Sequence, residues 1–330
     1  MISYKTLLYI GETYGVHDER FINALNLKFK VTTLFSTNNN PIKTFVQKQY
    51  DVVVVSPISL DLLKLSDAYS GQKVGICWAV EINNTTYKQN EIAFIKNILK
   101  DFKAVIVDAD YIAGRIREIF QFTGNIQKLY FGCDTSFFFQ TKSKNNQDKK
   151  VRICVTRRWL PLYNNEIIIE ALTRVRNQVP LEAMFTSQQK VLDSYHKSLI
   201  SDAKVKFKFI GEQSVQDIAK TYHDSDVYVS AAKSDGISVS LLEAMASGLI
   251  CIVTDFPTNL EVIKNGVNGF TFKNGDVVSL TNVLEQVLNL SKEEWSSIVR
   301  KAQEFILEFA DWQKNSSSVV KWLSESHYAG

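Results

Sequence analysis

Short apolar segments rich in valine and isoleucine recur along the whole chain, and they constrain its fold more than any other feature. In the first half they are TLLYIG (6–11), YDVVVVSP (50–57), KVGICWAV (73–80) and KAVIVDAD (103–110). In the second half they are RICVT (152–156), VKFKFIG (205–211), DVYVSAA (226–232), LICIVTD (249–255) and GFTF (269–272). Apolar runs without polar alternation are typical of strands buried on both faces, as in parallel sheets.

Helix-like segments separate these runs. Examples are DERFINALN (18–26), NEIAFIKNILKDF (90–102) and NEIIIEALTRVRN (165–177). Alternating strands and helices predict an α/β protein in which a doubly wound parallel sheet occurs twice. The polar stretch TKSKNNQDKK divides the two sets of strands. We therefore expect the domains to be 1–140 and 151–308, with a linker at 141–150 and a closing helix at 309–330.

Composition indicates an ordinary globular protein. Of 330 residues, 45% are hydrophobic and 22% are charged, which excludes a disordered or fibrous chain. The sequence has no apolar window of about 18 residues and no signal-peptide pattern near its start, so we expect a cytoplasmic protein. Cys77, Cys133, Cys154 and Cys251 are far apart and without metal-ligand spacing, which favours reduced thiols.

The net charge of +3 is unevenly distributed. Residues 1–150 hold 19 basic and 14 acidic side chains, and the remainder is slightly acidic. This excess is far from the basic stripe of a nucleic-acid-binding protein. It is compatible with ordinary solubility, and it leaves open peripheral contact between the first domain and a membrane surface.

The stretch SDGISVSLLEAMASG (234–248) carries the strongest chemical pattern. It predicts a turn at the end of a strand, followed by a helix that begins near Ser238–Ser240. The free N–H groups at such a helix start suit a diphosphate, and Gly236 allows close backbone approach. Glu243 could then accept hydrogen bonds from a ribose. The alternative is a capping box between Ser240 and Glu243, with Asp235 as an ordinary turn residue.

This region resembles the retaining GT-B glycosyltransferases of family 4. Their signature has the form E-G-F-G-x-x-x-L-E-A-M-A-x-G, and Asp235, Gly236, Leu242–Ala246 and Gly248 align with it. Further matching segments are YFGCDTSFF (130–138), VKFKFIGEQSVQDIAKTYHDSDVYVS (205–230), NGVNGFTF (265–272) and FADWQKNSSSVVKWL (309–323). The resemblance covers the second domain well and the first domain loosely.

The resemblance implies a GT-B fold, in which two Rossmann-like domains face a central cleft, and a set of site residues. Glu243 would hold the nucleotide ribose, and Asp235 would contact the donor sugar. The loop before Glu243 would hold the diphosphate, the loop after residue 210 the base, and the loop after the first strand the sugar and phosphates. The diphosphate loop contains Gly236, Ile237, Ser238 and Val239. The base loop contains Gly211 and Glu212, and the loop after the first strand contains Gly15.

The chain departs from the family pattern at several positions. The family's G-R-x-x-x-x-K-G places Arg158 at the arginine and Tyr163 at the lysine, although Arg157 is adjacent and the register could slip by one. Either arginine suits a bidentate grip on phosphate oxygens. In TDFPTNLE (254–261), Pro257 and Thr258 replace two glycines.

Two residues of the first domain are candidates for acceptor contact. His17 lies near a predicted helix start, where a solvated neighbour of the cap is the alternative. Glu81 follows the strand-like run KVGICW, where a surface carboxylate is the alternative.

The sequence therefore predicts a retaining, hexosyltransferase-type enzyme. It would move a sugar from a UDP or GDP donor to a glycan, lipid-linked or protein hydroxyl acceptor, in glycan, cell-envelope or glycoconjugate synthesis. No metal or other cofactor and no nucleic acid is expected. Two alternative functions are a non-catalytic partner subunit of a glycosyltransferase complex and a nucleotide-sugar epimerase. The sequence leaves the oligomeric state open.

Overall fold

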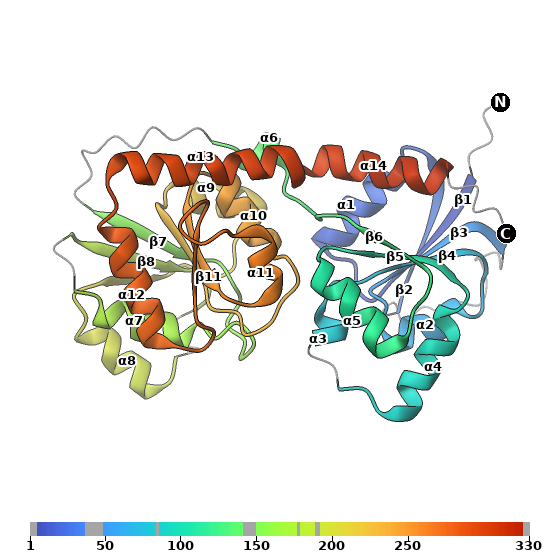
Figure 1. Ribbon diagram of the computed structural model, residues 1–330, viewed down its shortest axis with the longest axis horizontal. Coiled ribbons are helices and arrows are strands. Elements are labelled where there is room, and N and C mark those ends of the chain that lie inside the picture. Colours follow the sequence, from blue (N-terminus) through green and yellow to red (C-terminus); the bar gives the residue numbers. More distant parts are fainter. Residues whose placement is uncertain are drawn as a thin grey trace. The chain divides into compact units, whose positions relative to one another are not determined.

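The computed structural model describes residues 5–36, 49–83, 86–140, 150–176, 179–188 and 192–325. The chain divides into two compact units, which are described separately (Figure 1). Unit 1 comprises the residues up to Phe131 together with those from Gln313 onward. Unit 2 is Gly132–Trp312.

Unit 1 is built on a six-stranded parallel sheet of order β2-β1-β3-β4-β5-β6. Its strands are β1 (Lys5–Gly11), β2 (Phe29–Phe35), β3 (Gln49–Ser56), β4 (Ser70–Ile76), β5 (Phe102–Val107) and β6 (Asn125–Lys128). Its helices are α1 (Val16–Leu25), α2 (Leu60–Ser66), α3 (Val80–Asn83), α4 (Gln89–Leu99), α5 (Asp110–Phe120) and most of α14 (Trp312–Glu325).

Unit 2 is built on a second six-stranded parallel sheet, of order β12-β11-β10-β7-β8-β9. Its strands are β7 (Val151–Val155), β8 (Leu181–Phe185), β9 (Lys206–Phe209), β10 (Val227–Ser230), β11 (Ile250–Thr254) and β12 (Phe270–Phe272). Its helices are α6 (Thr135–Phe138), α7 (Glu166–Arg174), α8 (Ser194–Ser201), α9 (Val215–His223), α10 (Val239–Ala246), α11 (Pro257–Val262), α12 (Val277–Leu288) and α13 (Lys292–Phe309).

The cores lie along these strands, as the valine- and isoleucine-rich runs predict. Residues Val52–Val55 of β3 and Ile250–Val253 of β11 are all buried. In unit 2 the helices form two packed groups, α7 with α8 and α12, and α10 with α9 and α13 (Figure 1). The expectation of two doubly wound α/β sheets is therefore confirmed.

Three strands were not expected from the sequence. Strands β2 and β6 are edge strands, and an edge strand tolerates the polar residues that hide it in a search for apolar runs. Strand β8 lies inside the second sheet but carries the buried Glu182. Lys150 and Lys208 bind its two carboxylate oxygens at 3.0 and 2.9 Å, so the charge is paired.

The boundary between the units precedes the expected linker. Ser247 donates its hydroxyl to the Phe138 carbonyl at 3.0 Å, and the Gln140 N–H donates to the Ala246 carbonyl at 3.3 Å. These bonds tie α6 and the residues after it to α10, so 132–140 belong to unit 2 and not to the first domain. Residues 141–149 of the expected linker lie outside the described residues.

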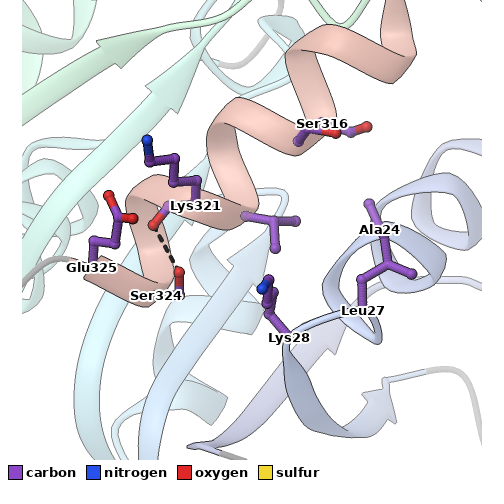
Figure 2. Close-up of a pocket in the computed structure, with 9 residues that line it drawn as sticks. Ala24, Leu27, Lys28, Ser316, Lys321, Ser324 and Glu325 are labelled. Carbon is purple, nitrogen blue, oxygen red and sulfur yellow. Dashed lines mark hydrogen bonds between the residues drawn. The ribbon is translucent and has the colours of Figure 1, made fainter.

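Helix α14 packs on unit 1. Asn315 donates to the Tyr130 carbonyl at 2.9 Å, and the Lys5 ammonium donates to the Ser324 carbonyl at 2.9 Å. Between α14 and the end of α1 lies a pocket of about 270 Å³, whose lining includes Leu27, Lys28 and Lys321 (Figure 2).

Two further features of the described residues concern the cysteines and the possibility of membrane-spanning helices. The four cysteines are all buried and free. Within the described ranges, no helix is both long and apolar enough to cross a bilayer.

Candidate functional site

The candidate site of unit 2 lies where the order of its sheet reverses. Strands β7 and β10 are hydrogen-bonded neighbours, yet the chain leaves β7 toward β8 on one side and β10 toward β11 on the other. Ligands of open α/β sheets bind at the carboxyl ends of the strands at such a switch point. Arg157 follows β7 and Asp235 follows β10, so the topology brings them together.

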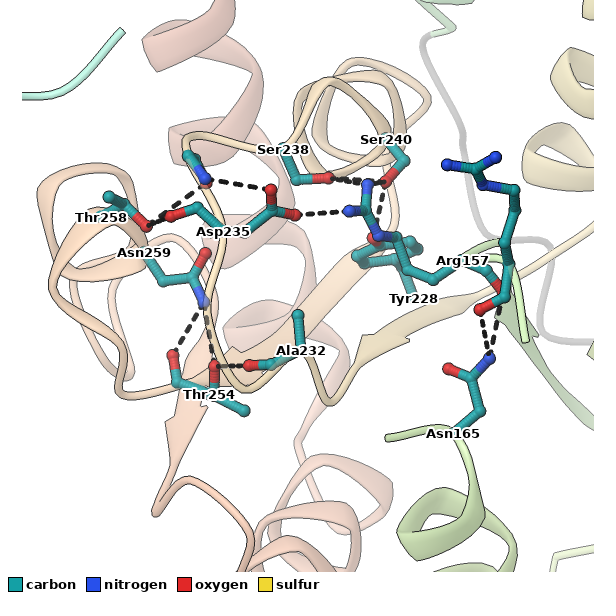
Figure 3. Close-up of polar contacts among 12 residues, drawn as sticks. Arg157, Asn165, Tyr228, Ala232, Asp235, Ser238, Ser240, Thr254, Thr258 and Asn259 are labelled. Atoms are coloured by element: carbon teal, nitrogen blue, oxygen red, sulfur yellow. Dashed lines mark hydrogen bonds and ion pairs between the residues drawn. The ribbon is translucent and has the colours of Figure 1, made fainter. Parts of the chain in front are cut away.

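Arg157 is the centre of a polar network at this point (Figure 3). Its Nη2 lies 2.5 Å from Oδ2 of Asp235. Its Nη1 donates to the hydroxyls of Ser238 at 2.9 Å and Ser240 at 3.3 Å. The Ser240 hydroxyl also bonds with Tyr228 at 3.0 Å. One side chain after β7 is thereby connected to the turn and the helix after β10.

The surroundings of Arg157 fix its guanidinium and keep it charged. The Tyr163 ring lies against its face, with Cζ of Arg157 4.0 Å from the ring centroid. Asn165 donates its amide to the carbonyls of Arg157 and Arg158, each at 3.1 Å. Burial opposes the charge, but Asp235 and the neighbouring tyrosines hold the pKa of Arg157 above its usual value. Burial raises the pKa of Asp235, which Arg157 limits.

The amino end of α10 has no side-chain cap. Its N-cap is Ser238, whose hydroxyl bonds to Arg157 and Ser240 and not to the helix backbone. Helix α13 shows the contrast, because Ser291 and Glu294 form a complete capping box there, with bonds of 3.2 and 2.8 Å. The proposed capping box between Ser240 and Glu243 is therefore wrong, since Ser240 lies inside the helix.

The uncapped helices of unit 2 include those that follow the central strands. Helices α7, α10 and α11 follow β7, β10 and β11, and none of them has a side-chain cap bond. Helices α8, α9, α12 and α13 each have one. At the switch point, the start of α10 therefore offers N–H groups that no side chain caps, together with the positive end of the helix dipole, and both favour an anion.

Glu243, one turn into α10, faces a buried tyrosine. The Tyr222 hydroxyl lies 3.4 Å from Oε2 of Glu243 and 2.9 Å from the Thr156 hydroxyl. Burial, and then the Glu243 charge, raise the pKa of Tyr222 well above its usual value. The phenol therefore stays protonated and can donate a hydrogen bond to the half-buried carboxylate.

Sequence reasoning missed the residues that hold the Asp235 turn. Thr258, which replaces a family glycine, donates its hydroxyl to the carbonyls of Asp235 at 3.1 Å and Gly236 at 3.3 Å. Asn259 donates to the Thr254 carbonyl at 3.0 Å. The departure at Thr258 was the signal that could have pointed to this support, because a hydroxyl can bind carbonyls that a glycine cannot.

The remaining sequence-predicted residues of unit 2 lie at the same edge of the sheet. The Ile237 side chain is buried, so only its backbone can serve a ligand. Val239 is the first residue of α10. Gly211 has a left-handed backbone with φ of 75°, which suits glycine, and Glu212 beside it is exposed.

The two adjacent arginines differ in their surroundings. Arg157 belongs to the network described above, with its side chain 15% exposed. Arg158 is exposed, and among the described residues its carbonyl, and not its guanidinium, makes hydrogen bonds. The arginine whose guanidinium lies beside the amino end of α10 is therefore Arg157, whereas the alignment with the family pattern favoured Arg158.

The candidate residues of unit 1 gather at the carboxyl end of the first sheet. The Gly15 N–H donates to Asp18 at 3.2 Å at the start of α1. His17 is exposed, and its ring centroid lies 5.1 Å from that of Trp78. The Trp78 indole N–H donates to the Ser56 hydroxyl at 2.9 Å, which orients the ring.

Glu81 is buried, so the alternative of a surface carboxylate is wrong. It accepts hydrogen bonds from the Trp78 N–H at 3.3 Å and from the Cys77 thiol at 3.9 Å. Burial raises the pKa of Glu81 to about 7, although these bonds oppose the rise. Among the residues that the structure describes, no group of three or more His, Cys, Asp or Glu side chains is placed to hold a metal.

Solved structures share this fold. HepE of Anabaena, determined with UDP and glucose, has a TM-score of 0.74 at 16% identity, covering 97% of this chain and 100% of that one. Sucrose-phosphate synthase from Thermosynechococcus elongatus has a TM-score of 0.80 at 12% identity, covering 99% and 100%. These likenesses confirm the α/β GT-B fold.

Curated relatives match over shorter segments. Sucrose synthase of Melioribacter roseus is 31% identical over 101 residues, which is 31% of this chain and 11% of the relative. N-acetyl-alpha-D-glucosaminyl L-malate synthase of Bacillus anthracis is 30% identical over 122 residues, or 36% and 30%. The aligned segments span 11–32% of the curated relatives' own length.

The family described as glycosyl transferases group 1 matches residues 136–305. This match covers more than half of the chain and contains Arg157, Asp235, Glu243 and all of α10. The chain therefore belongs to the group 1 glycosyl transferases.

Proposed function

We propose that this protein transfers a sugar from a nucleoside diphosphate to a hydroxyl acceptor with retention of anomeric configuration. The observation that carries the proposal is the uncapped amino end of α10 with the Arg157 guanidinium beside it. Group 1 membership supports the reaction, and the resemblance to the family 4 signature supports the proposed stereochemistry. HepE, with UDP and glucose, makes UDP the first nucleotide to try.

In this proposal the chemistry consists mainly of stabilising charge. Negative charge grows on the diphosphate as its bond to the sugar breaks. Arg157 and the N–H groups of α10 are fixed before the donor arrives, so they stabilise that charge without reorganisation. Glu243 accepts hydrogen bonds from the ribose, in exchange for its bond with Tyr222.

No metal is needed in this proposal, because Arg157 and the helix dipole supply the positive charge. We expect turnover to persist in EDTA, measured as nucleotide release from the preferred donor. Complete loss of turnover in EDTA, with recovery on addition of Mg²⁺ or Mn²⁺, would contradict this part of the proposal.

The deciding experiment measures nucleotide release from a panel of UDP- and GDP-sugars, with glycan, lipid-linked and protein acceptors. NMR of the product gives its anomeric configuration. Transfer with retention is expected. An isomerised nucleotide sugar would instead identify an epimerase.

Two observations favour a second candidate, the non-catalytic partner subunit. Arg157 is already paired with Asp235, and Tyr163 brings no charge where the family pattern has a lysine. A protein that is inert toward every donor and binds neither UDP nor GDP would establish that candidate over the enzyme.

A further inference from the structure

The Asp235 carboxylate is aimed at Arg157 by bonds on both of its oxygens. Oδ2 accepts from Nη2 of Arg157, and Oδ1 accepts from the Gly236 N–H at 3.0 Å. The Thr258 hydroxyl fixes the backbone of the same turn from α11. The Asp235 side chain is only 16% exposed. A carboxylate held in this way is built to orient a cation.

The Arg157 guanidinium is held on three sides. Asp235 binds one terminal nitrogen, the Ser238 and Ser240 hydroxyls bind the other, and the Tyr163 ring covers a face. Nε of Arg157 is buried and makes no hydrogen bond with any residue that the structure describes. The guanidinium therefore has a fixed position at the amino end of α10 and an N–H that is still unused.

We propose that Asp235 is a positioning residue for Arg157, and that it acts through the guanidinium and not on the donor sugar. This inference rests on the proposed function. Arg157, Asp235 and Tyr163 form a three-residue cluster, the arginine cluster. In it the carboxylate sets the position of the guanidinium, and the aromatic ring covers one face of the guanidinium. The arginine cluster presents a preorganised cation to the diphosphate of the donor.

The arginine cluster explains two departures from the family pattern together, Asp235 in place of a glutamate and Tyr163 in place of a lysine. Aspartate is one methylene shorter than glutamate, and here its short side chain ends at Arg157, where both oxygens are bound. Tyr163 contributes its ring, not a second charge. A single arginine that is rigidly held replaces two separate cations, because fixed donors lose less entropy when they bind an oxyanion.

The test compares a nucleotide that lacks the sugar with one that carries it. Calorimetric titrations would use UDP and UDP-glucose, or GDP and GDP-mannose if GDP is the nucleotide bound. Asp235→Asn should weaken the binding of both ligands by the same factor, about tenfold. If Asp235 contacted the sugar, the variant would weaken UDP-glucose binding and leave UDP binding unchanged, which would overturn the inference.

Two further comparisons give the inference a readout that a structural role would not produce. Arg157→Ala and the double variant Arg157→Ala, Asp235→Asn should bind UDP equally, because Asp235 acts only through Arg157. Tyr163→Phe should keep wild-type UDP affinity, whereas Tyr163→Leu should lose about three- to tenfold. Additive losses of UDP affinity in the double variant would contradict the proposed arginine cluster. A loss of UDP affinity in Tyr163→Phe equal to that in Tyr163→Leu would also contradict it.

A matched control exists on α13. Arg300 and Glu304 form an exposed ion pair of 2.7 Å in the same unit of the fold. Arg300→Ala and Glu304→Gln should leave UDP affinity unchanged, while melting curves of every variant verify folding. A folded wild type that binds neither UDP nor GDP would overturn the proposed function and this inference together. Selective loss of UDP-glucose binding in Asp235→Asn would overturn the inference alone.

Discussion

At the scale of single residues, the half-buried charge of Glu243 points to a partner. A carboxylate in the apolar helix α10 costs free energy unless it has a partner, and Tyr222 lies within reach of it. In the proposed function, ribose hydroxyls replace the Tyr222 phenol as the hydrogen-bond partner of Glu243.

Glu243→Ala should weaken UDP or GDP binding by about ten- to a hundredfold, because it removes charge-assisted hydrogen bonds worth about 1.5–3 kcal/mol. Calorimetric titration measures this loss. Glu294→Ala on α13 is the matched control, since Glu294 belongs to a true capping box. It should lower the melting temperature and leave nucleotide affinity unchanged. The opposite pattern in the two variants would exclude the ribose role of Glu243.

The buried Glu81 predicts how stability depends on pH. Its pKa is about 7 in the folded protein and 4.5 in the unfolded chain, so between these values the folded protein binds one more proton. The free energy of unfolding should therefore fall as pH rises from about 4.5 to 7, by about 3 kcal/mol from this group, and not fall further above pH 7.

Glu81→Gln should remove this fall, and the variant should be more stable than wild type at pH 8. Urea unfolding at pH 5, 6, 7 and 8 measures the difference. Glu19→Gln, on the exposed side of α1, is the control and should keep the wild-type slope. Parallel curves for wild type and Glu81→Gln would contradict the raised pKa.

At the scale of elements, the start of α10 lacks a side-chain cap, and its uncapped N–H groups favour an anion. Ser238→Asp should cap the helix and stabilise the protein by about 1 kcal/mol, because aspartate suits an N-cap and the positive end of the helix dipole. The same carboxylate would occupy the anion position and should weaken UDP binding by about tenfold or more.

Thermal melting and calorimetry on Ser238→Asp measure the two effects on one protein. Ser291→Asp, at the N-cap of α13, should leave UDP affinity unchanged. Unchanged UDP affinity in Ser238→Asp would place the diphosphate away from α10.

At the scale of the whole molecule, the two units should respond differently to a nucleotide. The proposed nucleotide contacts lie in unit 2, in the segments 156–163, 211–212 and 235–243. A ligand that binds only the native state stabilises the part that it contacts, by about 2.7 kcal/mol at a hundredfold excess over its Kd.

Hydrogen exchange followed by mass spectrometry should therefore show that UDP protects those segments and leaves α4 and α5 of unit 1 unchanged. Equal protection of both units by UDP alone would contradict this division.

The sequence by itself determined the class of fold. Central parallel strands such as β3 and β11 are buried on both faces, and burial on both faces requires uninterrupted apolar runs that are visible in one dimension. The start of α10 was equally visible, because the turn, the glycine and the small-residue helix follow one another along the chain. Strands β2, β6 and β8 were not, since edges and paired charges relax that requirement.

Only the tertiary structure decided which side chains meet at the candidate site. Arg157 and Asp235 are 78 residues apart in the sequence, and their contact depends on β7 pairing with β10 while β8 and β9 turn away. The same packing put Tyr222 beside Glu243 in place of a capping serine, and it brought Arg157, and not Arg158, into contact with Ser238 and Asp235. Local patterns fix which groups a segment offers, but strand order fixes which groups meet, because distant segments become neighbours only through the sheet.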